Sequence, residues 1–436
     1  APCFSRTAKE SDYSKELNMK ISACLITKNE SANIARCLES IPKTVDEIIV
    51  ADTGSTDDTV LIAQSYGARI FHYKWDNNFS NAKNYALDKA AGDWIIFLDA
   101  DEYFDSETQK NLPGVLKKMD SRKVDAVQCR MIHTDGFQGK VISENPSIRI
   151  FRNNQIRFSG SVHQKLLKNG KPLVCLFLTN VHLVIYHTGY ALNELQHKFR
   201  RNLAYLQELE RTCKLDHDTL YYLSSTYNSL GNHEKAIQYA MRALEDPRSG
   251  ELPFAYKLYV FLIKGMLQLQ DKYSSSDIEP YLARALELYP NHPEIHYVQA
   301  IFYKAKNQYH AAIESYSKAL QCHRDFDHNT LNDFPMRLEE VYRDLGYLNN
   351  IIGNAPDAVE YYYQALKINK YNAQSLASLY SLIKDQKVEE IVFFLNSIYN
   401  REDEKDLTFL CKVLINLNEQ AAGHYYSLWD AKFNNK

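Results

Sequence analysis

The chain has 436 residues, of which 45% are apolar and 24% charged, and its formal net charge is −3. This length exceeds the size at which one hydrophobic core usually keeps growing, so we expect two or three domains of an ordinary soluble protein. The nearly neutral charge argues against nucleic acid as a partner.

Cysteine spacing and hydropathy narrow the class further. The eight cysteines are scattered without metal-type spacing, which indicates reduced thiols and a cytoplasmic location. No apolar run approaches the roughly 20 residues that a membrane span needs, and no signal peptide is evident. Residues 1–18 are polar and aperiodic, which is typical of a tag or a flexible N-terminal extension.

Short apolar runs alternate with helical patterns from Ile21 onward. We expect strands at "ISACLITK", "EIIVAD", "ARIFHYK" and "DWIIFLD", separated by helices at "ESANIARCLESI", "STDDTVLIAQSYG" and "FSNAKNYALDKAAG". Thr56 or Asp57 would cap the second helix and Gly67 would end it. This order predicts an α/β domain, residues 19–190, with a mainly parallel sheet and helices on both faces.

Polar clusters follow three of these strands, namely Thr27–Glu30, Asp52–Asp58 and Asp99–Glu102. Ligands of such sheets bind beyond the carboxyl ends of the strands. Asp99 and Asp101, one residue apart in "DADE", could share one Mg²⁺ or Mn²⁺ ion, because hard cations prefer oxygen ligands. The alternative is that "DADE" only caps the following helix.

Four phrases occur together in order: "ITKNESANIARCLESI", "EIIVADTGSTDDTV", "FSNAKNYALDKAAGDW" and "FLDADE". Over roughly residues 20–190 they resemble family 2 glycosyltransferases of the GT-A fold, a Rossmann-like α/β fold. Together they are far more selective than any one of them, and they favour a metal site over a helix cap at "DADE".

The resemblance assigns roles to individual positions. It implies that Asp52 holds the uracil or ribose of a UDP-sugar, and that Asp99 and Asp101 carry a divalent metal that bridges the diphosphate. The remaining residues that it places at the nucleotide sugar are Thr27, Lys28, Asn29, Glu30, Lys83 and Ala100. Alternatives stay open for three of these positions: Asp52 as an Asx-turn residue, Glu30 as a helix N-terminal carboxylate and Lys83 as a solvated helix residue.

The catalytic base cannot be assigned by motif, because the Glu-Asp pair that many inverting members place after the DxD is missing between Asp105 and Tyr190. The candidates are His163 in "GSVHQ", His187 in "YHTGY", His133 and Asp135. Relatives with tetratricopeptide repeats often have Glu after the first of these histidines, whereas this chain has Gln164. Each histidine could complete a metal shell, accept the acceptor's proton, or serve only the structure.

The second half changes composition toward Tyr, Leu and Ala. An amphipathic linker helix is expected at residues 191–215, followed by degenerate tetratricopeptide-like helical repeats over residues 216–436. Related phrases place Ala at positions 243, 285, 319 and 365, and the step from Ala285 to Ala319 is the 34-residue period of such repeats. The aromatic surfaces of these helices predict a homodimer.

The combination of domains resembles bacterial S-glycosyltransferases that modify a cysteine in glycocin-type bacteriocin peptides. The resemblance implies an inverting, metal-dependent transfer of a hexose from a UDP-sugar to a peptide side chain. A thiol is already nucleophilic near neutral pH, which would tolerate the missing base. Transfer to a cell-envelope saccharide is the main alternative, and a non-catalytic repeat scaffold is disfavoured because Asp52, Asp99 and Asp101 are all intact.

Overall fold

The structure is a computed structural model that describes residues 19–120, 124–134, 141–160, 164–178, 181–188, 192–212, 215–246, 248, 250, 254–326, 333–415, 417 and 419–434. Two of the candidate bases, Asp135 and His163, and the N-terminal segment 1–18 lie outside these residues. The chain divides into two compact units between Leu195 and Gln196.

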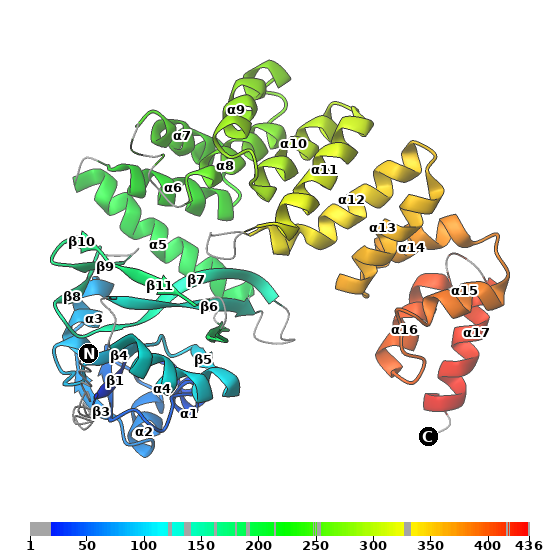
Figure 1. The fold of residues 1–436 in the computed structure, drawn as a ribbon. Helices are drawn as coiled ribbons and strands as arrows, with labels where there is room; N and C mark the ends of the chain where they lie inside the picture. The colour runs from blue at the N-terminus through cyan, green and yellow to red at the C-terminus, as the bar shows by residue number, and fades with distance from the viewer. Residues whose placement is uncertain are drawn as a thin grey trace, which may run out of the picture. The chain divides into compact units, whose positions relative to one another are not determined.

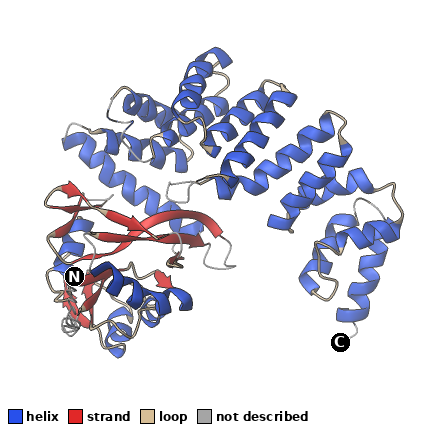
Figure 2. Ribbon diagram, in the orientation of Figure 1, coloured by secondary structure: helices blue, strands red, loops and turns tan. Residues whose placement is uncertain are grey.

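In the residues that the structure describes, the first unit is built on a mixed sheet of nine strands (Figures 1 and 2). The strand order is β3-β2-β1-β4-β7-β6-β12-β5, and β11 pairs with β6 off this path. The strands β1 to β4 are parallel, β7 is antiparallel to both of its neighbours, and β5 is antiparallel to β12. The strands are β1 (Ile21–Thr27), β2 (Glu47–Asp52), β3 (Arg69–His72), β4 (Trp94–Phe97), β5 (Glu102–Phe104), β6 (Ala126–Thr134), β7 (Val141–Arg152), β11 (Cys175–Phe177) and β12 (Val184–His187). The predicted mainly parallel α/β sheet is confirmed.

The strand β4 is buried along its whole length, and all four of its side chains are at most 1% exposed. Its residues divide between two apolar clusters, with Trp94 and Ile96 in one and Ile95 and Phe97 in the other. Because successive side chains of a strand point to opposite faces, these clusters lie on opposite sides of the sheet. Burial on both faces explains why "WIIF" is a continuous apolar run.

The helices of the first unit are α1 (Ile34–Glu39), α2 (Thr59–Ser65), α3 (Phe79–Leu87) and α4 (Ser106–Asp120). The expected cap of α2 at Thr56 or Asp57 was wrong by one or two residues, because Asp58 occupies the cap position. Asp57 nevertheless accepts hydrogen bonds from the backbone N–H groups of Thr59 and Ser31, each at 3.1 Å, and so joins the loops that follow β1 and β2. Gly67 follows the helix with a φ of 76°, which favours glycine.

A separate sheet of three strands, in the order β10-β9-β8, lies beside α3. Its strands are β8 (Ile156–Ser159), β9 (Lys165–Lys168) and β10 (Lys171–Pro172). Asn84 of α3 joins the helix to β8, because its amide nitrogen donates to the carbonyl of Phe158 and its amide oxygen accepts from the N–H of the same residue, both at 2.9 Å.

The second unit is helical throughout the part that the structure describes (Figure 2). The predicted linker helix is α5 (Leu192–Thr212), which runs across the division between the units. The helices that follow are α6 (His217–Ser229), α7 (His233–Leu244), α8 (Tyr256–Gln268), α9 (Ser275–Leu288), α10 (Pro293–Ala305), α11 (Tyr309–Arg324), η2 (Phe334–Arg337), α12 (Leu338–Ile351), α13 (Ala355–Ile368), α14 (Ala373–Ile383), α15 (Val388–Leu395), α16 (Glu404–Leu414), α17 (Glu419–Trp429) and η3 (Asp430–Asn434).

Neighbouring helices of this unit pack in pairs, of which α6 with α7, α10 with α11 and α12 with α13 are in extensive contact. The alanines expected at the repeat position, at 243, 285, 319 and 365, are all fully buried. Gly231 turns the chain between α6 and α7 with a φ of 74°, and Asn232 then caps α7 by accepting from the N–H of Lys235 at 3.1 Å. The tetratricopeptide-like pattern is confirmed.

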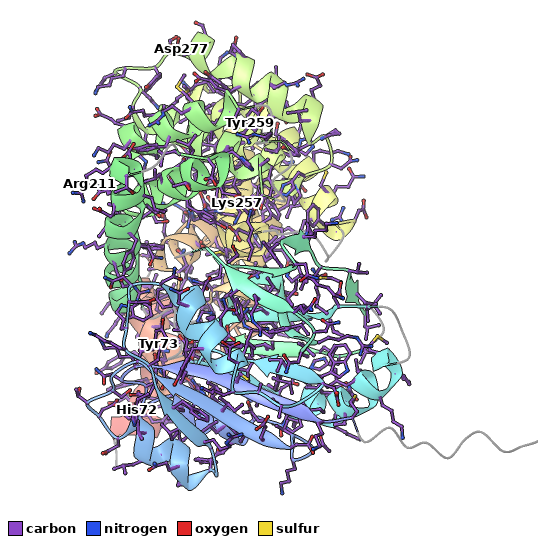
Figure 3. All side chains as sticks on the ribbon, turned by 90° about the vertical axis from the view of Figure 1, so that its left-hand side faces the viewer. His72, Tyr73, Arg211, Lys257, Tyr259 and Asp277 are labelled. Carbon is purple, nitrogen blue, oxygen red and sulfur yellow. The ribbon has the colours of Figure 1, made fainter. Side chains whose placement is uncertain are left out.

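Side chains of the helical unit also form ion pairs between repeats. Lys257, on α8 with Tyr259 (Figure 3), pairs with Asp333 at 2.5 Å. Farther along, Asp344 accepts from Tyr316 at 2.6 Å and pairs with Lys304. Within the described part of the chain, no helix is long and apolar enough to cross a membrane.

Candidate active site

Three polar clusters meet at one edge of the sheet, because β1 runs parallel to both β2 and β4. Thr27 at the end of β1 lies in register with Asp52 at the end of β2. The backbone N–H of Thr53 donates to the carbonyl of Thr27 at 2.9 Å and continues this pairing into the loop. The carboxyl ends of these strands therefore bring the predicted clusters together.

Asp52 is 2% exposed and is held mainly by its own turn. Its carboxylate accepts from the N–H groups of Gly54 and Ser55 at 3.1 Å, and His72, labelled in Figure 3, lies 3.5 Å away. Burial would raise the pKa of this carboxyl group, but the hydrogen bonds from Ser55 and Gly54 outweigh burial and lower it. The Asx-turn interactions are thus present, and they keep Asp52 ionised at the edge of the sheet.

The segment that follows β1 divides between exposed and structural positions. Lys28 is exposed, whereas Asn29 adopts a φ of 55° and accepts from the N–H of Thr56 at 2.8 Å. The Glu30 carboxylate accepts from the Asn33 side chain at 2.9 Å and its carbonyl accepts from the first turn of α1. The alternative in which Glu30 serves a helix N-terminus therefore agrees with its contacts.

Thr27 carries a polar atom of a different kind. Its side chain is 3% exposed, and its hydroxyl is buried without a hydrogen-bond partner among the residues that the structure describes. Buried hydroxyl groups are normally paired. This hydroxyl is therefore a free polar group at the expected nucleotide pocket.

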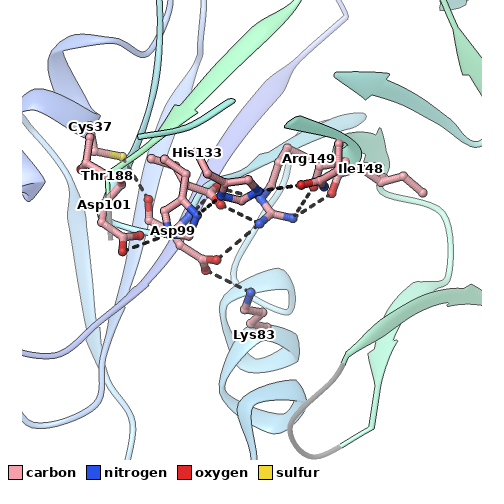
Figure 4. Close-up of polar contacts among 12 residues, drawn as sticks. Cys37, Lys83, Asp99, Asp101, His133, Ile148, Arg149 and Thr188 are labelled. Carbon is pink, nitrogen blue, oxygen red and sulfur yellow. Dashed lines mark hydrogen bonds and ion pairs between the residues drawn. The ribbon is translucent and has the colours of Figure 1, made fainter. Parts of the chain in front are cut away.

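Asp99 lies between two cations (Figure 4). Lys83 of α3 is 3.0 Å from one carboxylate oxygen, and Arg149 of β7 is 3.5 Å from the other. Burial would raise the pKa of Asp99, but Lys83 and then Arg149 hold it well below its usual range. Lys83 is 6% exposed, and its ammonium lies 5.2 Å from the ring centroids of Phe97 and Phe158, so its interpretation as a solvated residue was wrong.

A buried ion pair supports the loop that carries Asp99. Arg149 donates from Nε and Nη2 to the two carboxylate oxygens of Glu102, at 2.7 and 2.6 Å, and the Glu102 side chain is fully buried. The same carboxylate accepts from the backbone N–H of Asp99 at 3.1 Å. Burial lowers the pKa of Arg149, but Glu102 and Asp99 outweigh it and raise the pKa above its ordinary value. The "DADE" loop is thus held by a bidentate, charge-assisted contact.

Arg149 was not predicted from the sequence. The available signal was a charged residue in the otherwise apolar run "SIRIF", between two isoleucines that pair with the central strands. A lone arginine inside such a strand requires a buried anion.

Asp101 begins a chain of polar contacts through two histidines. His187 Nε2 lies 3.2 Å from a carboxylate oxygen of Asp101, and His187 Nδ1 lies 2.9 Å from Nδ1 of His133. The other nitrogen of His133 lies 2.6 Å from the amide oxygen of Asn145. Burial lowers the pKa of His187, but the hydrogen bond and charge of Asp101 outweigh it and raise the pKa.

The backbone around Asp101 is held separately. Thr188 donates to the carbonyl of Asp101 from both its N–H and its hydroxyl, each at 3.1 Å, and Arg36 donates to that hydroxyl at 2.6 Å. Ala100, between the two aspartates, is 4% exposed. The structure therefore brings together Lys83, Asp99, Asp101 and His187.

The ligand atoms at this site determine whether it can hold a metal ion. Among the described residues no group of three or more His, Cys, Asp or Glu is arranged to hold a metal ion. Magnesium typically takes only one or two carboxylates and completes its shell with phosphate and water oxygens. The adjacent carboxylate oxygen of Asp101 and ring nitrogen of His187 could serve as two such ligand atoms, whereas both oxygens of Asp99 are paired with Lys83 and Arg149. Asp99 as a metal ligand stays a prediction.

Comparison with known proteins agrees with this architecture. Residues 22–173 match the family described as Glycosyl transferase family 2, and residues 217–245 and 293–321 match a tetratricopeptide repeat. The first unit thus contains a family 2 glycosyltransferase domain, and the helical unit contains tetratricopeptide repeats.

Individual relatives cover part of the chain. The SPbeta prophage-derived glycosyltransferase SunS of Bacillus subtilis is 31% identical over 239 residues, which are 54% of this chain and 55% of SunS. A tetratricopeptide repeat-containing protein of Synechococcus elongatus is 33% identical over 235 residues, 52% of this chain and 56% of that protein. An uncharacterized glycosyltransferase of Rickettsia felis is 33% identical over 147 residues, 33% of this chain and 52% of the relative. The chain spans about half the length of each of these relatives.

Proposed function

We propose that this chain, a family 2 glycosyltransferase domain followed by tetratricopeptide repeats, is an inverting glycosyltransferase that moves a hexose from a UDP-sugar to a peptide side chain. The acceptor we favour is a cysteine thiol of a bacteriocin precursor. The observation that carries the proposal is the convergence of Asp99, Asp101, Lys83 and His187 beyond the ends of the parallel strands. Asp52 and the unpaired hydroxyl of Thr27 lie at the ends of the neighbouring strands, and Asn29 lies in the loop that follows β1, where the nucleoside would bind.

The chemistry of the donor half requires stabilisation of negative charge, because the departing nucleoside diphosphate accumulates charge as the glycosidic bond breaks. Asp101 and His187 would hold a divalent Mg²⁺ or Mn²⁺ ion, which when bound supplies Lewis acidity to the diphosphate. Lys83 and Arg149 hold Asp99 ionised and fix its orientation. Asp99 is then available as an acceptor for hydroxyl groups of the donor.

The acceptor half is constrained by the missing base. The sequence offers no motif-placed carboxylate after the DxD, and His187 is engaged with Asp101. A serine hydroxyl would need a strong general base, whereas a thiol is partly ionised near neutral pH. A cysteine acceptor fits this site better than a hydroxyl does, and His163 remains the candidate base for either.

Self-association belongs to the same proposal. Large apolar side chains are exposed near the C-terminal end of the helical unit, with Phe393 83%, Ile415 66% and Tyr426 55% exposed. A two-fold contact would bury such side chains in the commonest oligomeric arrangement. Light scattering over a concentration series should give the mass of a homodimer, and a concentration-independent monomer mass would refute the dimer. A cytoplasmic location is proposed with it.

The test of the donor site is calorimetric titration of UDP with and without Mn²⁺. The wild-type protein should bind UDP more tightly with Mn²⁺, and Asp101→Asn should lose that gain. Asp88→Asn is the matched control, because the Asp88 side chain forms an exposed ion pair with Arg157. If Mn²⁺ strengthens UDP binding equally in Asp101→Asn and Asp88→Asn, Asp101 is not part of the cation site.

The test of the acceptor compares a cysteine peptide with its serine counterpart. Transfer should fall by at least about 100-fold with serine, the range that general base catalysis typically supplies. Equal rates on both peptides would refute the argument from the missing base. Efficient transfer to a simple saccharide with none to any peptide would favour the cell-envelope alternative.

A further inference from the structure

Two histidines from neighbouring strands contact one another beside the DxD motif (Figure 4). The strands β6 and β12 are parallel, and their register places His133 directly beside His187. The ring centroids are 5.0 Å apart and the two Nδ1 atoms are 2.9 Å apart. A contact of this length between two ring nitrogens requires one of them to donate and the other to accept.

Asn145 determines which ring donates. Its amide oxygen lies 2.6 Å from Nε2 of His133, and its amide nitrogen donates to the carbonyl of Pro146 at 3.3 Å. A flipped amide would place an oxygen against that carbonyl, so the orientation is fixed by its own partners. Because the amide oxygen can only accept, Nε2 of His133 carries the proton.

The direction of the remaining hydrogen bonds follows from the position of this proton. His133 is 6% exposed, and in the neutral imidazole tautomer with its proton on Nε2 the Nδ1 atom has a lone pair. That lone pair accepts from Nδ1–H of His187. The other nitrogen of His187, Nε2, is then presented to Asp101 at 3.2 Å.

We propose that His133, oriented by Asn145, is a positioning residue that holds the His187 imidazole as an Nδ1–H donor and presents its Nε2 at Asp101. This inference rests on the proposed role of His187 and Asp101 at the donor diphosphate. A ligating histidine usually donates its other ring N–H to an acceptor, commonly a carboxylate, a backbone carbonyl or water, which fixes the ring orientation and raises the basicity of the ligating nitrogen. His133 supplies that partner here from the strand adjacent to His187.

The first test measures the tautomer of His133 in metal-free protein labelled with ¹⁵N-histidine. The His133 signals, assigned by their loss in His133→Asn, should show a protonated Nε2 and an unprotonated Nδ1. A protonated Nδ1 on His133 would reverse the chain and overturn the inference. This measurement does not depend on catalysis or on metal binding.

The second test measures Mn²⁺ binding by electron paramagnetic resonance in the presence of UDP. His133→Leu removes the acceptor and should weaken Mn²⁺ binding about 10-fold or more, the effect typical of losing such a partner. His133→Asn places an amide oxygen near the lost Nδ1 and should restore most of the affinity. His182→Gln is the control, because His182 pairs with Asp105 at 2.6 Å outside this chain of contacts.

The outcomes separate the inference from the function on which it rests. Wild-type affinity in a folded His133→Leu protein would overturn the inference, as would failure of His133→Asn to rescue while thermal unfolding is unchanged. Absence of Mn²⁺ binding by the wild-type protein would refute the cation in the proposed function, and the tautomer of His133 would still decide the inference.

Discussion

Replacing Arg149 by methionine should destabilise the first unit more than any surface substitution. The change removes both charge-assisted hydrogen bonds to Glu102, at 2.6 and 2.7 Å. Among the described residues it leaves the fully buried carboxylate with one partner, the N–H of Asp99 at 3.1 Å. Breaking a buried ion pair by removing one partner typically costs about 3–5 kcal/mol, because the other charge stays buried. We expect the free energy of unfolding to fall by about 3 kcal/mol.

The assay is urea unfolding followed by fluorescence of Trp94, which is fully buried on β4. The other two tryptophans, Trp75 and Trp429, are replaced by phenylalanine so that the signal comes from Trp94 alone. The matched control is Arg157→Met, because Arg157 and Asp88 form an ion pair whose side chains are 43% and 57% exposed. Exposed pairs contribute at most about 1 kcal/mol.

The double variant with Glu102→Gln sharpens the test. A neutral amide removes the uncompensated charge, so Arg149→Met with Glu102→Gln should be less destabilised than Arg149→Met alone. Arg149 does not stabilise Glu102 in this way if Arg149→Met lowers the free energy of unfolding no more than Arg157→Met does. The same follows if Arg149→Met with Glu102→Gln is less stable than Arg149→Met alone.

Three further predictions concern packing and charge. Gly92→Ala should lower the free energy of unfolding by about 1–3 kcal/mol, because a Cβ would lie 2.6 Å from backbone of β1. Gly114→Ala in α4 places a Cβ with nothing within 4 Å and should raise the free energy of unfolding by up to about 1 kcal/mol. Equal effects of the two substitutions would contradict this prediction. Burial and then Arg337 lower the pKa of Lys264 to about 8, so the unfolded state binds more protons between about pH 8 and 10, and wild-type stability should rise across that window relative to Lys264→Met in urea titrations. The depressed pKa of Asp99 contributes stability that is present above about pH 4 and lost as the pH falls, so Lys83→Met should flatten this acid dependence, and an unchanged acid unfolding curve would argue against the pair.

The strand and helix order of the first unit was predictable because its signals are local. "WIIFLD" is apolar on both faces, and each helix ends near a glycine or a polar turn. The start of α2 was less predictable, because several polar residues in "STDDT" can each accept a helical N–H and tertiary contacts decide among them. The antiparallel insertion of β7 between β4 and β6 is a non-local pairing that no sequence window contains.

The candidate site was predictable where its residues follow strands directly. Asp52, Asp99 and Asp101 are such residues, and Lys83 depended on the family resemblance. Arg149 and Asn145 were not predictable, because their partners lie 47 and 12 residues away, and only the fold brings them together. Which charged side chains meet at such a site therefore depends on the order of the strands in the sheet.

The two hydrogen bonds of Asn84 to Phe158 have a consequence for how a peptide could approach the first unit. The strand β8 pairs with β9 on one edge, and at Phe158 its other edge is occupied by a side-chain amide in place of a backbone. A strand edge with unpaired backbone groups would instead pair with an extended segment by β-augmentation. Because both groups of Phe158 are already satisfied, no extended peptide can lengthen this small sheet at that residue.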